Sequence, residues 1–286
     1  MGILEPDRHE GVADRLRAGE GLVGVVLKMP GPALAEVAGH AGLDLVVLDA
    51  EHGPNGADML EHHVRAADCA GIPVLVRVSA NDRTQILAAL DGGATGVIVP
   101  HVNTPEEAAA AVRAAYYPPD GNRGFALSTR AGWYGTRRLE SHLGDAARQT
   151  LVIVQVEDAA AIPYVTAIAA TPRVDAVWMG PSDLSMSLGH PSEFTHPEVV
   201  AAVDQIDSQI KRANGARLCV IVRTEDEARA WRRRGAGLVL FSALDLIADR
   251  FAELATEAIP RGLRGGPAGN GQLPTPRPAQ TVSDPT

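Results

Sequence analysis

The sequence predicts an α/β fold, and specifically a single (β/α)8 TIM barrel. The chain has 286 residues, the size of one large barrel domain. It contains eight short runs that are almost entirely Val, Ile and Leu, as expected of parallel strands buried on both faces. Helix-length segments separate these runs, and regular alternation of strand and helix indicates a closed parallel barrel.

The expected strands follow one another at intervals that leave room for a helix. They are Leu22–Lys28, Leu45–Asp49, Val74–Val78, Gly96–Pro100, Leu151–Val156, Ala176–Met179, Leu218–Val222 and Leu238–Phe241. The segments Thr104–Ala115 and Thr224–Arg234 show helical periodicity, and each opens on a threonine followed by acidic residues. That pattern is typical of a capped helix amino terminus.

The interval Tyr116–Gln149 is longer than a βα unit needs and contains the run Y-P-P-D-G-N-R-G at Tyr117–Gly124. Long structured insertions at the top of a barrel usually serve function, and we expect that here. Residues 1–20 are expected to form an N-terminal segment, residues 21–258 the barrel, and residues 261–286 a disordered, non-catalytic tail rich in Gly and Pro.

Composition excludes several classes of function. The net charge of −9 argues against nucleic-acid binding, and the sequence contains no P-loop motif. No apolar run resembles a signal peptide or a membrane span. Cys69 and Cys219 lack the spacing of a zinc site or a disulfide framework. We therefore expect a soluble cytoplasmic protein that acts on small molecules.

Polar residues at the carboxyl ends of the expected strands are the candidates for chemistry, because barrel enzymes place their active sites there. These residues are Asp49, Glu51, His52, Arg77, Gln155, Glu157, Ser182 and Asp183. Glu157 and Asp183 offer hard oxygen ligands for Mg²⁺, Mn²⁺ or a similar ion. Two solvent-facing acids are the alternative, but Gln155 and the turn Gly180-Pro181-Ser182 favour a metal site.

His52 is the candidate general base, since imidazole titrates near neutral pH and Asp49 lies three residues away to orient it. A structural histidine is the alternative. Arg77 lies in an apolar strand and should meet a carboxylate or a developing oxyanion, because an unpaired buried cation is costly. His101 follows the fourth strand without an obvious orienting partner and stays unassigned.

Taken together, these motifs resemble the HpcH/HpaI aldolase family. The resemblance runs from about Leu22 to Phe251, in the order L-D-A-E-H-G at Leu48–Gly53, V-R-V-S-A-N-D at Val76–Asp82, L-D-G-G-A at Leu90–Ala94, Y-P-P-D-G-N-R-G at Tyr117–Gly124, Q-V-E at Gln155–Glu157 and G-P-S-D at Gly180–Asp183. Members are metal-dependent, class II pyruvate aldolases with a barrel of the phosphoenolpyruvate/pyruvate superfamily type.

The resemblance implies a role for each matched residue. Glu157 and Asp183 would hold a divalent cation, Mg²⁺, Mn²⁺ or Co²⁺, while Gln155, Arg77 and the Ser182 backbone bind the pyruvate unit. His52 would be the base, oriented by Asp49, and Arg77 would stabilise the enolate oxygen. The family also implies a homo-oligomer, commonly hexameric, in which Asp91 approaches the active site of an adjacent subunit.

The implied reaction is reversible cleavage of a 4-hydroxy-2-oxo acid, such as a 2-dehydro-3-deoxy-aldarate, into pyruvate and an aldehyde through a metal-stabilised enolate. Aldehyde selectivity is expected in Tyr116–Gln149, from Phe125, Arg130, Trp133 and Tyr134. Three alternatives remain: a Schiff base on Lys28, with Lys211 badly placed; an acyl-CoA lyase of the citrate lyase β or malyl-CoA lyase type; and a non-catalytic metabolite-binding barrel.

Overall fold

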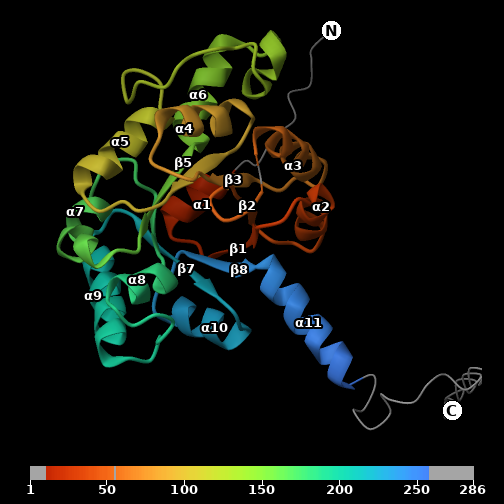
Figure 1. Cartoon of the computed structure of the whole chain (residues 1–286). Helices are drawn as coiled ribbons and strands as arrows, with labels where there is room; N and C mark the ends of the chain where they lie inside the picture. Colours follow the sequence, from red (N-terminus) through yellow and green to blue (C-terminus); the bar gives the residue numbers. More distant parts are fainter. Residues whose placement is uncertain (1–10, 55, 258–286) are drawn as a thin grey trace, which may run out of the picture. The chain divides into compact units, whose positions relative to one another are not determined.

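The computed structural model describes residues 11–54 and 56–257, and within them eight parallel strands close into a barrel in sequence order (Figure 1). The strands are β1 (Leu22–Leu27), β2 (Leu45–Asp49), β3 (Val74–Arg77), β4 (Gly96–Val99), β5 (Leu151–Val156), β6 (Ala176–Met179), β7 (Arg217–Val222) and β8 (Leu238–Ser242). The barrel prediction is confirmed, and each expected strand end agrees to within one residue.

Helices alternate with the strands. They are α1 (Val12–Ala18), α2 (Pro32–His40), α3 (Ala57–Cys69), α4 (Arg83–Asp91), α5 (Pro105–Ala115), α6 (Leu139–Gln149), α7 (Val165–Ala169), α8 (Pro181–Ser187), α9 (Pro197–Ala213), α10 (Glu225–Arg233) and α11 (Ala243–Glu257), with short 3₁₀ turns at Arg130–Gly135 and Ala159–Tyr164. Thr104 and Thr224 form capping boxes with Glu107 and Glu227, as expected for the starts of α5 and α10.

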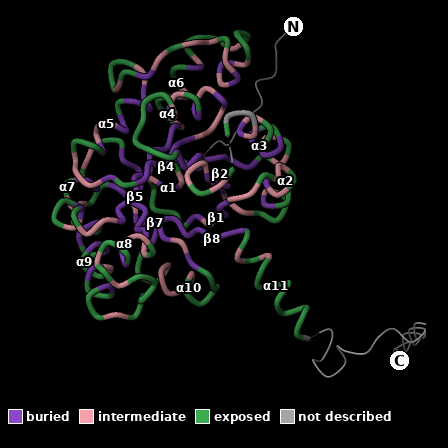
Figure 2. Tube along the Cα trace, in the orientation of Figure 1, coloured by how far each residue is buried: buried purple, intermediate pink, exposed green. Residues whose placement is uncertain are grey.

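Side chains from alternate strand positions fill the barrel interior, because successive residues of a strand point to opposite faces. One buried cluster contains inward-facing residues such as Leu45, Val47 and Leu75. A second, larger cluster packs the outer faces of the strands against the helices. Figure 2 shows the strands as almost continuously buried segments.

The N-terminal segment contributes directly to the barrel core. Val12, Ala13 and Leu16 of α1 are buried in the same cluster as the inward-facing strand residues. This helix therefore helps to fill the barrel interior, which the division at residue 20 did not anticipate.

The Tyr116–Gln149 excursion lies at the amino ends of the strands, so its expected position at the top of the barrel is wrong. It follows α5 and leads directly into β5, and helices of a barrel run antiparallel to the strands. Two of its arginines pair with residues at the carboxyl-terminal ends of helices: Arg123 with Asp91 of α4, and Arg130 with Asp68 of α3. Within one chain, Phe125, Arg130, Trp133 and Tyr134 therefore belong to the face opposite the strand carboxyl ends.

The chain divides into two compact units, Met1–Leu246 and Ile247–Thr286. The described part of the second unit is the helical stretch 247–257, in which Phe251 and Leu254 are exposed. The expected tail, residues 261–286, lies outside the described residues. Among the described helices, none is both long enough and apolar enough to cross a bilayer.

Candidate active site

A polar layer caps the apolar interior of the barrel at the strand carboxyl ends. Asp49, Arg77 and Gln155 occupy the inward-facing positions directly after Val47, Leu75 and Ile153. Asp49 and Arg77 are register partners in β2 and β3, so their side chains meet. The same alternation that builds the core therefore aims these polar groups into the barrel mouth.

Arg77 and Asp49 form a buried bidentate ion pair. Arg77 Nε donates to Asp49 Oδ1 at 2.9 Å and Arg77 Nη2 donates to Asp49 Oδ2. Asp49 Oδ1 also accepts from the backbone N–H groups of Glu51 and His52, each at 3.1 Å. Burial works to raise the pKa of Asp49, but the hydrogen bonds and charge of Arg77 outweigh it and hold that pKa below its ordinary value.

These contacts clarify two expected roles. Arg77 meets a carboxylate, as a buried cation requires. Asp49 holds the backbone of the loop that carries His52, whose side chain is 51% exposed and lies 3.8 Å from Glu51 Oε2 by its Nε2. Asp49 therefore fixes the position of the His52 backbone just past the end of β2.

Glu157 is the most perturbed carboxyl group of the site. It is 1% exposed, receives a 2.5 Å hydrogen bond from Gln155 Nε2 on Oε2, and accepts the His101 backbone N–H at 3.0 Å on Oε1. Burial is the main cause that raises the pKa of Glu157 to about 7; the charges of Asp183 and Glu51 add to this rise, and the backbone N–H and charge of His101 oppose it.

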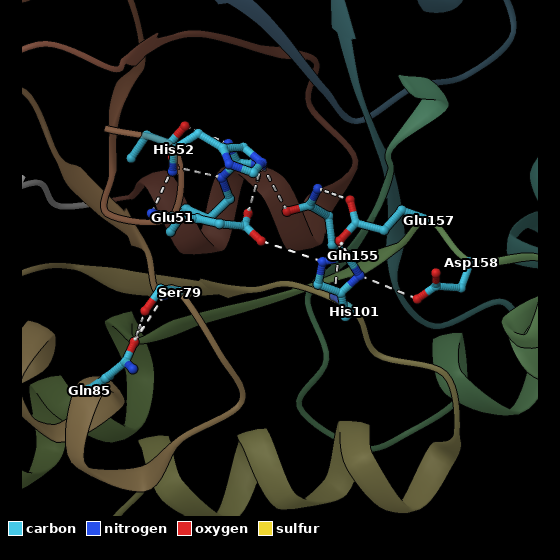
Figure 3. A network of polar contacts seen from close by, with 10 residues as sticks. Glu51, His52, Ser79, Gln85, His101, Gln155, Glu157 and Asp158 are labelled. Atoms are coloured by element: carbon cyan, nitrogen blue, oxygen red, sulfur yellow. Dashed lines mark hydrogen bonds and ion pairs between the residues drawn. The ribbon is translucent and has the colours of Figure 1, made fainter. Parts of the chain in front are cut away.

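His101 joins this cluster and was left unassigned by the sequence. Figure 3 shows its ring between Glu51 on one side and Asp158 on the other. His101 Nε2 lies 3.6 Å from Glu51 Oε1, while Nδ1 lies 3.4 Å from Glu157 Oε1 and 3.3 Å from Asp158 Oδ2. Partial burial opposes protonation, but the charges of Glu157, Asp158 and Glu51 raise the pKa of His101.

The backbone of His101 has φ of 52°, in the left-handed region that residues other than glycine seldom adopt. His101 lies two residues past the end of β4, and the neighbouring strand β5 carries Gln155 and leads to Glu157. Such outliers concentrate at functional sites, where the surrounding structure holds them.

The cluster has the properties of a divalent-cation site. One ligand atom each from Glu51, His101 and Glu157 lie within 4.8 Å of one another. Glu51 Oε2 is buried, and although Arg77 Nη1 is 3.1 Å away, no donor in the described part of the chain is aligned for a hydrogen bond to it. Buried carboxylates that repel one another fit a cation that would neutralise them.

Asp183 and Ser182 lie in the first turn of α8, directly after β6. Asp183 is half-buried and close enough to Glu157 to affect its pKa. Ser182 is exposed, and its carbonyl accepts the Ser185 hydroxyl at 2.7 Å. Gly180, between β6 and α8, allows the backbone to lie close to the Glu157 carboxylate, because a Cβ at this position would lie 2.6 Å from Glu157 Oε2.

Asp91 lies apart from this cluster in the same chain. It ends α4 and pairs with Arg123 at 2.8 Å. It also lines a cavity of about 320 Å³ together with Glu61, Arg130 and Tyr134. The implied role of Asp91 in an adjacent subunit remains a prediction.

The two lysines of the chain, Lys28 and Lys211, lie at different elements. Lys211 lies on α9 and pairs with Asp207 at 2.9 Å, which agrees with its expected poor placement. Lys28 directly follows β1 and is half-buried.

Comparisons with known proteins agree with this geometry. Residues 23–243 match the family model described as HpcH/HpaI aldolase/citrate lyase. The chain is 36% identical to the 5-keto-4-deoxy-D-glucarate aldolase of Salmonella paratyphi C, over 76% of this chain and 84% of that protein. It is also 36% identical to the hydroxypyruvate/pyruvate aldolase of Paraburkholderia phytofirmans, over 82% of this chain and 90% of that protein.

A solved structure shares the fold. The crystal structure of an HpcH/HpaI aldolase/citrate lyase family protein from Burkholderia cenocepacia superimposes with a TM-score of 0.82 at 36% identity, covering 87% of this chain and 98% of the other. The expected class of enzyme, an aldolase acting as a carbon–carbon lyase, is confirmed by these matches. The chain belongs to the HpcH/HpaI aldolase/citrate lyase family.

Proposed function

We propose that this enzyme reversibly cleaves a 4-hydroxy-2-oxo acid to pyruvate and an aldehyde, by a class II, metal-dependent mechanism. The observation that carries the proposal is the concentration of buried carboxylates at the barrel mouth, next to Arg77, Gln155 and two histidines. The names of the relatives support substrates of the 2-keto-3-deoxy sugar acid class, such as 5-keto-4-deoxy-D-glucarate.

Glu157 and Asp183 are the proposed metal ligands, and Glu51 and His101 lie beside them. A bound divalent cation would supply a Lewis acid for the carboxylate and keto oxygens of pyruvate. Oxygen-rich ligation suits Mg²⁺, Mn²⁺ or Co²⁺, and the His101 nitrogen would favour the later ions of that series.

The remaining residues bind substrate and move the proton. His52 is exposed at the barrel mouth, where its ring can take a proton from the pyruvate methyl group and return it in the cleavage direction. Arg77 Nη1 donates to Gln155 Oε1 at 3.4 Å, which holds the two side chains together; the guanidinium of Arg77 would stabilise the enolate oxygen, and Gln155 would help to bind the pyruvate unit. The Ser182 backbone would bind the pyruvate carboxylate.

Deuterium exchange into pyruvate tests this proposal most directly. Wild-type enzyme should exchange the methyl protons in D₂O only when Mg²⁺, Mn²⁺ or Co²⁺ is present, as followed by proton NMR. Full activity after EDTA treatment would refute the metal, and exchange in His52→Ala at the wild-type rate would refute the base. Turnover of acyl-CoA thioesters without such exchange would favour the acyl-CoA lyase reading. Borohydride trapping of pyruvate on Lys28 would favour a Schiff base.

The proposed homo-oligomer and Asp91 have their own test. Asp91→Asn and Glu157→Ala should each be inactive, and mixed oligomers of the two should recover part of the activity if Asp91 serves a neighbouring site. Analytical ultracentrifugation reports the assembly state. Mixed oligomers that form but recover no activity would contradict the role of Asp91.

A further inference from the structure

A second cluster of metal-binding side chains lies in the loop between α8 and α9, outside the active site. His190, Glu193 and His196 are spaced three residues apart, and one ligand atom of each lies within 4.8 Å of the other two. Neither the family match nor the proposed reaction accounts for them.

Two consecutive turns hold these residues together. The Glu193 N–H donates to the His190 carbonyl at 3.1 Å, and the His196 N–H donates to the Glu193 carbonyl at 2.9 Å. Ser192, between them, has a left-handed φ of 60° and donates its N–H to Ser185 Oγ at 3.0 Å. Because Ser185 belongs to α8 and is fully buried, the loop is anchored on that helix.

The two imidazole rings are stacked, with centroids 3.4 Å apart and planes 20° from parallel. Glu198 Oε2 lies 3.0 Å from His190 Nε2, so that nitrogen is the donor and His190 Nδ1 is left as a ligand. A carboxylate that orients a histidine in this way is the usual outer shell of a metal-bound imidazole. His196 Nδ1 receives only a long, 3.3 Å hydrogen bond from the Glu198 N–H, which an ion could replace at small cost.

We propose that His190, Glu193 and His196 bind a divalent transition-metal ion of the zinc class, with Glu198 orienting His190. Two imidazole nitrogens and one carboxylate oxygen form a common zinc donor set, with the fourth position left for water. Nitrogen donors favour zinc over Mg²⁺ and Mn²⁺, unlike the carboxylate-rich cluster at the barrel mouth. The ion would fasten the start of α9 to the loop anchored on α8, the helix that carries Asp183.

Variants of this loop can remove a ligand while preserving its structural contacts. His190→Phe keeps an aromatic ring for the stack but has no ligand nitrogen. His196→Asn keeps a side-chain oxygen that can cap α9. Glu198→Gln retains the size of the side chain but weakens the orientation of His190.

Zinc titration of tag-free protein by isothermal calorimetry, in millimolar Mg²⁺, tests the proposal. The loop variants are made in the Glu157→Ala background, which removes a ligand of the proposed active-site cation. Glu157→Ala itself should bind one zinc ion per chain and gain thermal stability. We expect His190→Phe and His196→Asn to bind at least about 10-fold more weakly, and Glu198→Gln about 10-fold more weakly. Circular dichroism checks that each variant folds.

Two results would overturn the inference: folded His190→Phe and His196→Asn that, in the Glu157→Ala background, bind zinc as tightly as Glu157→Ala alone, or folded Glu157→Ala that binds no zinc. The proposed aldolase reaction would stand in either case, because its test is metal-dependent proton exchange.

Discussion

The active-site cluster and the α8–α9 loop cluster both combine imidazoles with carboxylates, but the chain holds them by different means. Glu157 is almost fully buried at the end of β5, where its negative charge is unfavourable without a counter-ion. Glu193 is exposed, and backbone turns place the histidines beside it. The comparison indicates that rigid strand ends can force charges together at the expense of stability, whereas turns gather ligands at little cost.

Removing the buried carboxylate should have the largest effect. Glu157→Ala should lower metal-dependent pyruvate proton exchange by about 10³-fold or more, because the proposed ion would lose its most buried ligand. Proton NMR measures the rate, and Arg229→Ala, an exposed residue of α10, is the matched control. Exchange within a few-fold of wild type would mean that Glu157 is not a metal ligand.

The stability of the metal-free enzyme should fall as pH rises through the range in which Glu157 ionises. Its pKa is raised from 4.5 to about 7 in the folded state, so the folded protein holds the proton longer than the unfolded chain. The contribution of Glu157 to stability is therefore fully present below pH 4.5, is lost between 4.5 and about 7, and amounts to about 3 kcal/mol.

Urea denaturation at several pH values checks this decline after EDTA treatment. Glu157→Gln should remove it, and added Mn²⁺ should restore stability to wild type at high pH. If wild type and Glu157→Gln showed the same pH dependence, the burial of Glu157 would not be the cause.

His101 tests whether the strand-end cluster uses a nitrogen donor. His101→Gln should weaken Mn²⁺ binding by about 10-fold, because a neighbour of Glu51 and Glu157 is lost. Electron paramagnetic resonance of free Mn²⁺ measures the affinity. Equal affinities in the two proteins would assign His101 a purely structural role.

The loop cluster should show the smallest effect. In metal-free protein, His196→Ala should cost about 0.5–1 kcal/mol of stability through the lost cap of α9, while His196→Asn should cost only a few tenths. Thermal denaturation compares the two variants. A large loss of stability in both variants would contradict the view that the turns hold the loop in place at little cost in free energy.

Most of the barrel could be predicted because each buried strand is an apolar run bounded by polar or turn residues. Asp49, Arg77, Gln155 and Glu157 were identifiable for the same reason, since each lies at or just past the end of such a run. Family membership and the class of enzyme followed from the motifs that contain them.

Other features depended on the path of the chain in space. His101 meets Glu51 and Glu157 because the chain takes a left-handed conformation at His101, two residues past the end of β4 and beside β5, and no local sequence pattern predicts this conformation. The length of Tyr116–Gln149 does not reveal on which face of the barrel the segment lies, whereas its place between α5 and β5 does. A segment that follows a helix returns to the amino ends of the strands.

The close contact at Gly180 should make this position intolerant of substitution, which a saturation mutational scan in cells can measure without purified protein. Any side chain at this position would place a Cβ 2.6 Å from Glu157 Oε2, whereas a Cβ at Gly144 meets no atom within 4 Å. In cells that depend on the enzyme for growth, every substitution at codon 180 should therefore be depleted, while alanine at codon 144 persists. That contrast would show that the space beside Glu157 is under selection in the living cell.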